Sequence, residues 1–133
     1  HPLYIKKYER SLYHFVKENG IIIDNATPLN IAIEFADVVV VNNSTVGIEA
    51  ILKYKATVVL GNAFYDYPNI CLKLKTKNEL ETLIEKALTY SPNKEAINNF
   101  KHLLFTRVLL EGSITDKDLK SSKHISNHLL ATH

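Results

Sequence analysis

A short polar stretch between two apolar stretches carries the residues best suited to chemistry. Four valines at 38–41 are followed by Asn-Asn-Ser-Thr and then by Val-Gly-Ile-Glu-Ala. This pattern predicts a buried strand, a tight polar turn, and a helix that begins near Ser44. Backbone N–H groups at such a turn suit an anion or a sugar phosphate, and the hydroxyl of Ser44 or Thr45 can donate to a phosphate oxygen. Glu49 follows one helical turn after Thr45, and its carboxylate suits sugar hydroxyls better than phosphate.

A purely structural interpretation explains the same residues equally well. Ser44 is then an ordinary N-cap, and Glu49 occupies a favourable position near the positive end of the helix dipole. The other candidates are weaker on local grounds. His124 and His128 have the i, i+4 spacing of a metal pair, but no acidic third ligand is in register, so solvated helix residues are expected. Cys71 is expected to be a small core residue.

Two further features can be interpreted only together with the elements that would lie next to them. His1, followed by proline, would face the same cleft if a strand preceded it. The loop at 64–68, Phe-Tyr-Asp-Tyr-Pro, is unusually aromatic and either closes over a ligand or plugs the surface of the domain.

Apolar periodicity places alternating helices and strands around these residues. Buried strands are predicted at 21–23, 38–41 and 57–60, with a half-exposed strand near 72–74. Helices are predicted at 4–18, at 28–36 with Thr27 as its N-cap and most of its surface buried, from 44 onward, and at 80–88, 93–110 and 116–131. The inward positions of the helices at 80–88 and 93–110 are predicted to be Leu80, Leu83, Ile84, Ala87, Leu88, Ile97, Phe100, Leu104 and Val108.

This order of elements predicts an α/β fold. Right-handed βαβ crossovers give a Rossmann-like parallel sheet flanked by helices, with a helical C-terminal extension. Ligands of such sheets bind beyond the carboxyl ends of the strands. The residues expected to gather at that edge are Asp24, Asn25, Asn42, Asn43, Ser44, Gly61 and Asn62.

Composition narrows the class of protein. The chain has 133 residues, a net charge of +2 and a single cysteine, so one domain without an internal disulfide is expected. The charge gives no electrostatic footprint for nucleic acid. No apolar run approaches the roughly 20 residues that span a bilayer. These features favour a cytoplasmic protein, and the absence of an initial methionine favours a domain taken from a longer one.

Several motifs in order resemble the capsule polysaccharide biosynthesis and export family, which includes β-Kdo transferases. They are His-Pro-Leu-Tyr at 1–4, Asp-x-x-x-Pro-Leu at 24–29, Ala-Asp-Val-Val-Val-Val-Asn-Asn-Ser-Thr-Val-Gly-Ile-Glu-Ala at 36–50, and Val-Val-Leu-Gly-Asn-Ala-Phe-Tyr-Asp at 58–66. The resemblance covers about residues 1–70.

The resemblance implies the C-terminal half of a GT-B glycosyltransferase, whose active site lies between two Rossmann-like halves. Residues 1–112 would be the nucleotide-sugar-binding domain and 113–133 a C-terminal helical segment. The implied donor is CMP-Kdo, with His1 as the catalytic residue at its phosphate. Asn43, Ser44 and Thr45 would line the phosphate and carboxylate pocket, and Glu49 would hold the ribose. The predicted donor site is completed by Gly47, Asp24 and Asn62.

The same resemblance implies partners. They are a nucleotide sugar and a lipid-linked glycan acceptor bound by the other half, with peripheral association at the inner membrane or with a capsule-assembly complex. No cofactor and no metal is expected, and the isolated chain is expected to lack transferase activity. Two alternatives stay open: a non-catalytic module for capsule assembly or export, and a GT-B-fold epimerase acting on UDP-sugars.

Overall fold

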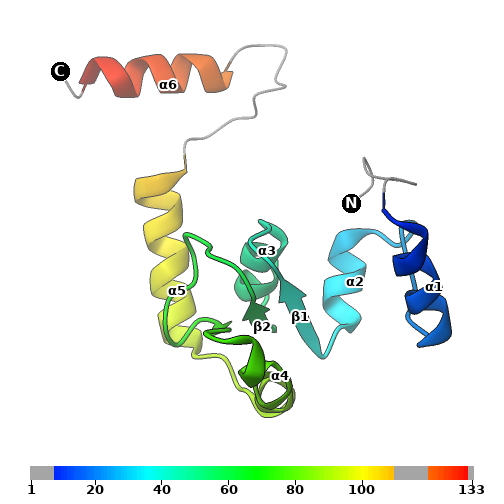
Figure 1. Cartoon of the computed structure of the whole chain (residues 1–133). Coiled ribbons are helices and arrows are strands. Elements are labelled where there is room, and N and C mark those ends of the chain that lie inside the picture. Colours follow the sequence, from blue (N-terminus) through cyan, green and yellow to red (C-terminus); the bar gives the residue numbers. More distant parts are fainter. Residues whose placement is uncertain (1–7, 110–119, 132–133) are drawn as a thin grey trace. The chain divides into compact units, whose positions relative to one another are not determined.

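A computed structural model describes residues 8–109 and 120–131 of the chain. The chain forms two compact units, residues 1–36 and 37–133. Figure 1 labels the main helices and strands of both.

The first unit contains two helices. Helix α1 spans Arg10–Glu18, so the predicted helix is confirmed from residue 10 onward. Asn19 is its C-cap, and the next residue, Gly20, has a φ of 66°, a left-handed conformation that glycine adopts without strain. The N–H of Ile21 closes the helix end by donating to the carbonyl oxygen of Val16 at 2.9 Å.

The predicted strand at 21–23 is wrong. The three isoleucines have no strand conformation, and their side chains are 50%, 87% and 54% exposed. Branched side chains favour an extended backbone, but a strand also needs a neighbour for its backbone hydrogen bonds. No strand is present among the described residues of this unit.

Helix α2 spans Leu29–Phe35 and is confirmed in position but not in burial. Only Ile33 is buried, whereas Phe35 is 83% exposed. The N-cap position is occupied by Pro28 instead of the predicted Thr27. The apolar sequence of this helix predicted a core element, although Ile33 is its only buried residue.

The second unit is built on a parallel sheet in the order β1–β2–β3. Strand β1 spans Val38–Val41, β2 spans Ala56–Val59 and β3 spans Leu72–Lys73. Val38 is level with Ala56 in the first pair, and Val58 is level with Leu72 in the second. The predicted Rossmann-like α/β class is thus confirmed, with a three-stranded sheet. Helix α3, Val46–Leu52, forms the crossover between β1 and β2.

Helices cover both faces of this sheet. Successive side chains of a strand point to opposite faces, so neighbouring strand residues pack against different helices. On one face Val41 and Val59 pack with Ile51 of α3 and with Ile97 and Phe100 of α5, which spans Lys94–Leu103. On the other face Val58 and Leu72 pack with Ala87 of α4, which spans Leu80–Thr89. Every residue of β2 is buried, whereas Val40 of the edge strand β1 is 46% exposed. The predicted burial of β1 is therefore only partly correct.

The helices after β3 depart from prediction at their ends. A short 3-10 turn, Lys77–Glu79, precedes α4, and Leu80 and Leu88 are 40% and 64% exposed instead of inward. The ten-residue α4 covers a three-stranded sheet, so only its central positions reach the core. Asn93 caps α5 by accepting from the N–H of Ala96 at 3.0 Å.

Beyond α5 the chain continues as a π-helical segment, Leu104–Val108. The wider winding changes the angle between successive side chains. Leu104 stays buried as predicted, but Val108 is 54% exposed, so its predicted inward position is wrong. Helix α6 spans Lys120–Ala131 and confirms most of the predicted last helix. The predicted boundary at 112/113 lies outside the described residues. None of the described helices is long and apolar enough to cross a membrane.

Candidate functional site

The polar segment Asn42–Thr45, called the 42–45 turn below, lies at the carboxyl edge of the sheet. It follows β1 directly, and all four of its residues are exposed. The N–H of Gly61, just after β2, donates to the carbonyl oxygen of Asn42 at 2.9 Å. The ends of the two strands therefore meet as predicted, which brings Asn42, Gly61 and Asn62 to one edge.

Unused backbone donors are the main chemical feature of this turn. The N–H groups of Asn43, Ser44 and Thr45 have no hydrogen-bond acceptor in the part of the chain that the structure describes. Three successive donors of this kind, at the edge where ligands of parallel sheets bind, suit an oxyanion. The side-chain hydroxyl of Thr45 likewise has no partner among the described residues.

Ser44 makes the capping hydrogen bond that the structural interpretation expected. Its hydroxyl oxygen accepts from the N–H of Val46 at 3.3 Å, which leaves its own hydrogen available. Thr45, directly before α3, already has helical backbone angles and makes no side-chain cap. Helix α3 has only seven residues, so its dipole adds little, and the donors of the turn itself matter more.

Glu49 lies where the sequence placed it, one helical turn beyond Thr45. Its N–H donates to the carbonyl oxygen of Thr45 at 3.3 Å, and its side chain is exposed. The carboxylate forms no ion pair or hydrogen bond with the other described residues. An acceptor-only group beside a set of donors can bind hydroxyl groups of the same ligand whose anionic part the donors hold.

Gly47 is buried for a reason that the sequence did not reveal. A β-carbon at this position would lie 2.5 Å from the hydroxyl oxygen of Tyr65 and 2.8 Å from a ring carbon. Tyr65 is 1% exposed, and its hydroxyl donates to the carbonyl oxygen of Ser44. Gly47 therefore permits the close approach of Tyr65.

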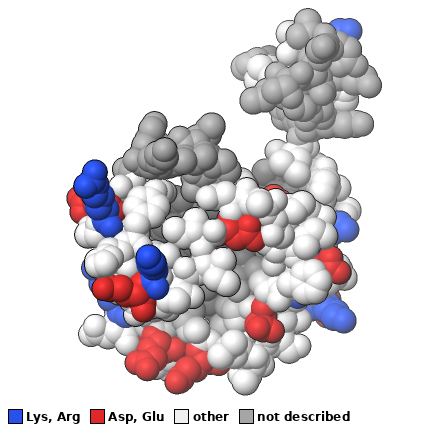
Figure 2. Space-filling model, turned by 90° about the vertical axis from the view of Figure 1, so that its right-hand side faces the viewer, with Lys and Arg blue, Asp and Glu red and all other residues white. Residues whose placement is uncertain are grey.

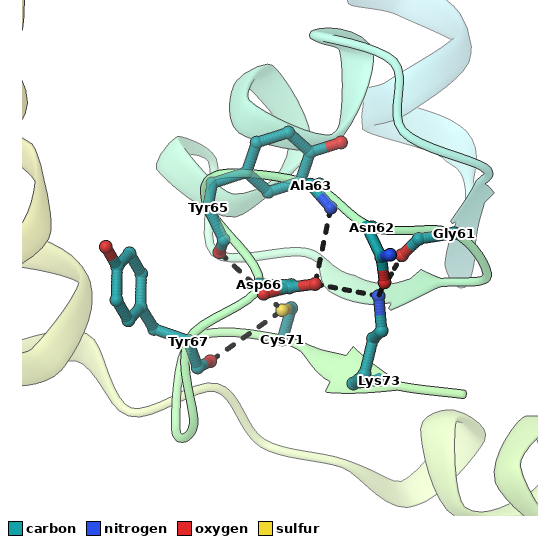
Figure 3. Close-up of polar contacts among 8 residues, drawn as sticks. All are labelled: Gly61, Asn62, Ala63, Tyr65, Asp66, Tyr67, Cys71 and Lys73. Carbon is teal, nitrogen blue, oxygen red and sulfur yellow. Dashed lines mark hydrogen bonds and ion pairs between the residues drawn. The ribbon is translucent and has the colours of Figure 1, made fainter. Parts of the chain in front are cut away.

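A second polar cluster holds the loop after β2 (Figure 3). The ammonium group of Lys73 in β3 lies 2.7 Å from Oδ2 of Asp66 and also donates to the carbonyl oxygen of Gly61. It lies 3.2 Å from Oδ1 of Asn62, so the amide oxygen of this predicted donor-site residue is already bonded within the protein. The hydrogen bond from Lys73, together with that from the N–H of Ala63, lowers the pKa of Asp66 below its ordinary value.

The aromatic loop fills the surface of the domain with one of its rings and exposes two others. Tyr65 plugs the core, whereas Phe64 and Tyr67 are 59% and 55% exposed. Cys71 lies beneath the loop, and its thiol donates to the carbonyl oxygen of Tyr67 at 3.7 Å. Its burial confirms the predicted core role and raises the pKa of the Cys71 thiol to about 11.

The remaining candidate residues lie in other parts of the chain, and their local surroundings are as follows. Asp24 follows no strand; its Oδ1 accepts from the N–H groups of Ala26 and Thr27, each at 2.9 Å. The side chain and N–H of Thr27, with the N–H of Ala26, lower the pKa of Asp24. His1 lies outside the described residues. His124 and His128 are exposed on α6, and no metal-binding group of three His, Cys, Asp or Glu occurs among the described residues.

Surface shape and charge add little to the definition of the site. Figure 2 shows acidic and basic side chains on one face, in places side by side and elsewhere scattered over uncharged surface. Charges of both signs are mixed there, so this face carries no broad field of one sign. An open recess of about 490 Å³ lies along α1, and none of the predicted site residues lines it. Its lining residues are Arg10, Ser11, Tyr13, His14 and Lys17.

Sequence reasoning missed Tyr65 and Lys73 as contributors to the edge. Tyr65 reaches a residue 21 positions earlier, and Lys73 reaches one 12 positions earlier. Lys73 looked like an exposed residue of an alternating strand. Only the pairing of β3 beside β2 places its ammonium group under the loop.

The second unit is a Rossmann-like α/β domain with a polar, donor-rich turn at the carboxyl edge of its sheet. The chain belongs to the family described as capsule polysaccharide biosynthesis protein, whose sequence profile matches residues 2–113. This match confirms the family that the motifs had suggested. No curated protein and no solved structure matches the chain.

Proposed function

We propose that this chain is the donor-binding domain of a capsule polysaccharide glycosyltransferase that transfers Kdo from CMP-Kdo. The observation that carries the proposal is the set of unused donors on the 42–45 turn at the carboxyl edge of a parallel sheet. Membership of the capsule polysaccharide biosynthesis family supplies the biological context. Two Rossmann-like halves would enclose the reaction, and this chain would supply one of them.

The turn would stabilise the CMP leaving group. Transfer of the sugar breaks the bond between its anomeric carbon and a phosphate oxygen, so negative charge grows on the phosphate. N–H groups of residues 43–45 and the hydroxyls of Ser44 and Thr45 would donate to that charge, with His1 as a further phosphate contact. These donors are fixed by the fold, so they need little rearrangement as the charge develops.

Glu49 would bind the ribose of the same nucleotide. Its carboxylate is exposed and unpaired among the described residues, and it lies one helical turn from the donors. Two vicinal ribose hydroxyls can donate to one carboxylate, whereas a phosphate would be repelled by it. The orientation of the nucleotide follows from this division, with phosphate at Ser44 and Thr45 and ribose toward Glu49.

The acceptor would come from outside this chain. The proposal places a lipid-linked glycan and a catalytic carboxylate in the other half of the enzyme. It also places the reaction in the cytoplasm, at the inner face of the membrane or within a capsule-assembly complex. The isolated chain would hold one wall of a two-walled site and would not turn over substrate.

A specific observation favours a second candidate function, a non-catalytic glycan-binding module for capsule assembly. Phe64 and Tyr67 expose aromatic surface on a loop that the Lys73 cluster holds in place. Aromatic rings that do not fill the core suit the apolar faces of sugars. This role needs no nucleotide at the 42–45 turn.

Titration calorimetry of the full-length protein with CMP, UDP and a capsule oligosaccharide separates these functions. The proposed transferase binds CMP with a clear preference over UDP. A preference for UDP would favour the epimerase, and binding of oligosaccharide alone would favour the glycan-binding module. Replacing Tyr67 by alanine should leave CMP affinity within about twofold of the unsubstituted protein, because its side chain has no hydrogen bond to the 42–45 turn among the described residues.

A further inference from the structure

Two paths of contacts lead from Lys73 to the two ends of the 42–45 turn. The first path is short. Lys73 donates to the carbonyl oxygen of Gly61, and the N–H of Gly61 donates to the carbonyl oxygen of Asn42 at 2.9 Å. Gly61 also packs so closely that an added β-carbon would overlap Oδ1 of Asn42. The first residue of the turn is thereby fixed against the end of β2.

The second path runs through the aromatic loop. Lys73 binds Asp66 at 2.7 Å, and Asp66 accepts from the N–H of Ala63 at 3.3 Å (Figure 3). These bonds hold both sides of Tyr65, which is buried and donates its hydroxyl hydrogen to the carbonyl oxygen of Ser44. The same carbonyl oxygen accepts from the N–H of Gly47 at 3.0 Å.

The position of this carbonyl determines where a donor of the turn points. The peptide group that joins Ser44 to Thr45 is planar and trans, so its C=O and N–H point in opposite directions. Tyr65 and Gly47 fix the oxygen on the protein side. The Thr45 N–H is therefore directed away from the buried Tyr65 hydroxyl, and it is one of the donors without an acceptor among the described residues.

We propose that Tyr65 is a positioning residue for the donor site, and that Lys73 and Asp66 hold the loop that presents it. The proposal rests on the proposed function, because it assigns Tyr65 a part in orienting the groups that would bind the nucleotide phosphate. A phenylalanine would fill the same volume in the core, so the hydroxyl is the group with the positioning role. Tyr65 acts through Ser44 and does not touch the ligand.

Tyr65→Phe in the full-length protein tests this role with two independent measurements. The first is hydrogen–deuterium exchange of the unliganded protein, read on peptides that cover residues 44–50. The second is the dissociation constant for CMP. Tyr54→Phe is the matched control, because its hydroxyl also donates a hydrogen bond, to Oδ1 of Asn98 at 2.7 Å, but away from the turn.

If Tyr65 positions the turn, Tyr65→Phe should show faster exchange in the peptides that cover residues 44–50. Its CMP binding should be weakened about five- to tenfold, which corresponds to the loss of one hydrogen bond of about 1 kcal/mol or slightly more. Tyr54→Phe should change neither measurement at the turn. Lys73→Met should also speed exchange at 44–50. This variant keeps the Tyr65 side chain, so it provides the test if Tyr65→Phe does not fold.

Two results overturn the proposal. Unchanged exchange at 44–50 in both Tyr65→Phe and Lys73→Met would show that the hydroxyl does not order the turn. CMP affinity that falls equally in Tyr65→Phe and Tyr54→Phe would show a general effect on stability. Failure of the unsubstituted protein to bind CMP would instead refute the proposed function, while the exchange data would still decide whether Tyr65 orders the turn.

Discussion

Gly47→Ala tests the packing of Tyr65 against the start of α3. The added β-carbon would lie 2.5 Å from the Tyr65 hydroxyl oxygen and 2.8 and 2.9 Å from two ring carbons. Non-bonded carbon atoms pack at about 3.5–4.0 Å, so either the ring or the helix must shift by several tenths of an ångström. Tyr65 is only 1% exposed, and its ring has little room to move.

Three effects determine how much Gly47→Ala changes the free energy of unfolding. Overpacking a well-filled site costs about 1–3 kcal/mol. Displacing the tyrosine hydroxyl from the Ser44 carbonyl costs about 1 kcal/mol more. Alanine is better than glycine within a helix by about 1 kcal/mol, which offsets part of this loss. The free energy of unfolding should therefore fall by about 1–3 kcal/mol.

Urea denaturation of the chain, followed by circular dichroism, measures this change as a lower midpoint. Gly61→Ala is the comparison, because its β-carbon would meet Oδ1 of Asn42, the end of an exposed side chain that can rotate away. We expect a smaller loss for Gly61→Ala than for Gly47→Ala. The double variant Gly47→Ala/Tyr65→Phe should lose less than the two single losses added together, since both act on one contact. A midpoint for Gly47→Ala equal to or above that of the unsubstituted chain would refute this packing argument.

Two further predictions concern the cluster beneath the loop. The pKa of Asp66 is lowered, so its ion pair contributes stability that is fully present above the ordinary carboxyl pKa of about 3.9 and is lost as the pH falls through the lower folded value. Lys73→Met should reduce the free energy of unfolding by about 1–2 kcal/mol near pH 7. Urea denaturation at several pH values should show that this difference between the variant and the unsubstituted chain becomes smaller below about pH 3.9. A difference that does not depend on pH would contradict the role of the ion pair. Cys71 is buried, and the pKa of its thiol is raised to about 11. Iodoacetamide at pH 8 should therefore label Cys71 only after urea unfolds the chain. Rapid labelling of the folded chain would contradict the buried position of Cys71.

Local sequence determined the elements whose partners are close in the chain. The valine run at 38–41 and the segment at 56–59 are joined by one short helix, so their parallel pairing follows from the order of elements. The isoleucine run at 21–23 has the same kind of composition but forms no strand. Strand propensity alone does not create the neighbour that a strand needs, and this difference is not visible in a window of a few residues.

The candidate site also contains some features that local sequence predicts and others that depend on strand pairing. The spacing of Thr45 and Glu49 is a property of one helical turn, so the sequence predicted it directly. The contacts of Tyr65 and Lys73 join the turn after β1, the loop after β2, and β3, and they depend on which strands lie side by side. Asn62 illustrates the limit: its place at the edge was predictable, but its bond to Lys73 was not.

The central claim is that the 42–45 turn binds the phosphate of a cytidine nucleotide. The direct measurement is titration calorimetry of the full-length protein with CMP, compared with Ser44→Ala/Thr45→Ala. The control is Ser91→Ala/Thr76→Ala, which removes two exposed hydroxyls elsewhere in the second unit. Loss of hydrogen bonds to a charged phosphate should weaken CMP binding by at least about tenfold in the turn variant, with the control unchanged. Equal CMP affinity in all three proteins, with the turn variant folded, would contradict the claim.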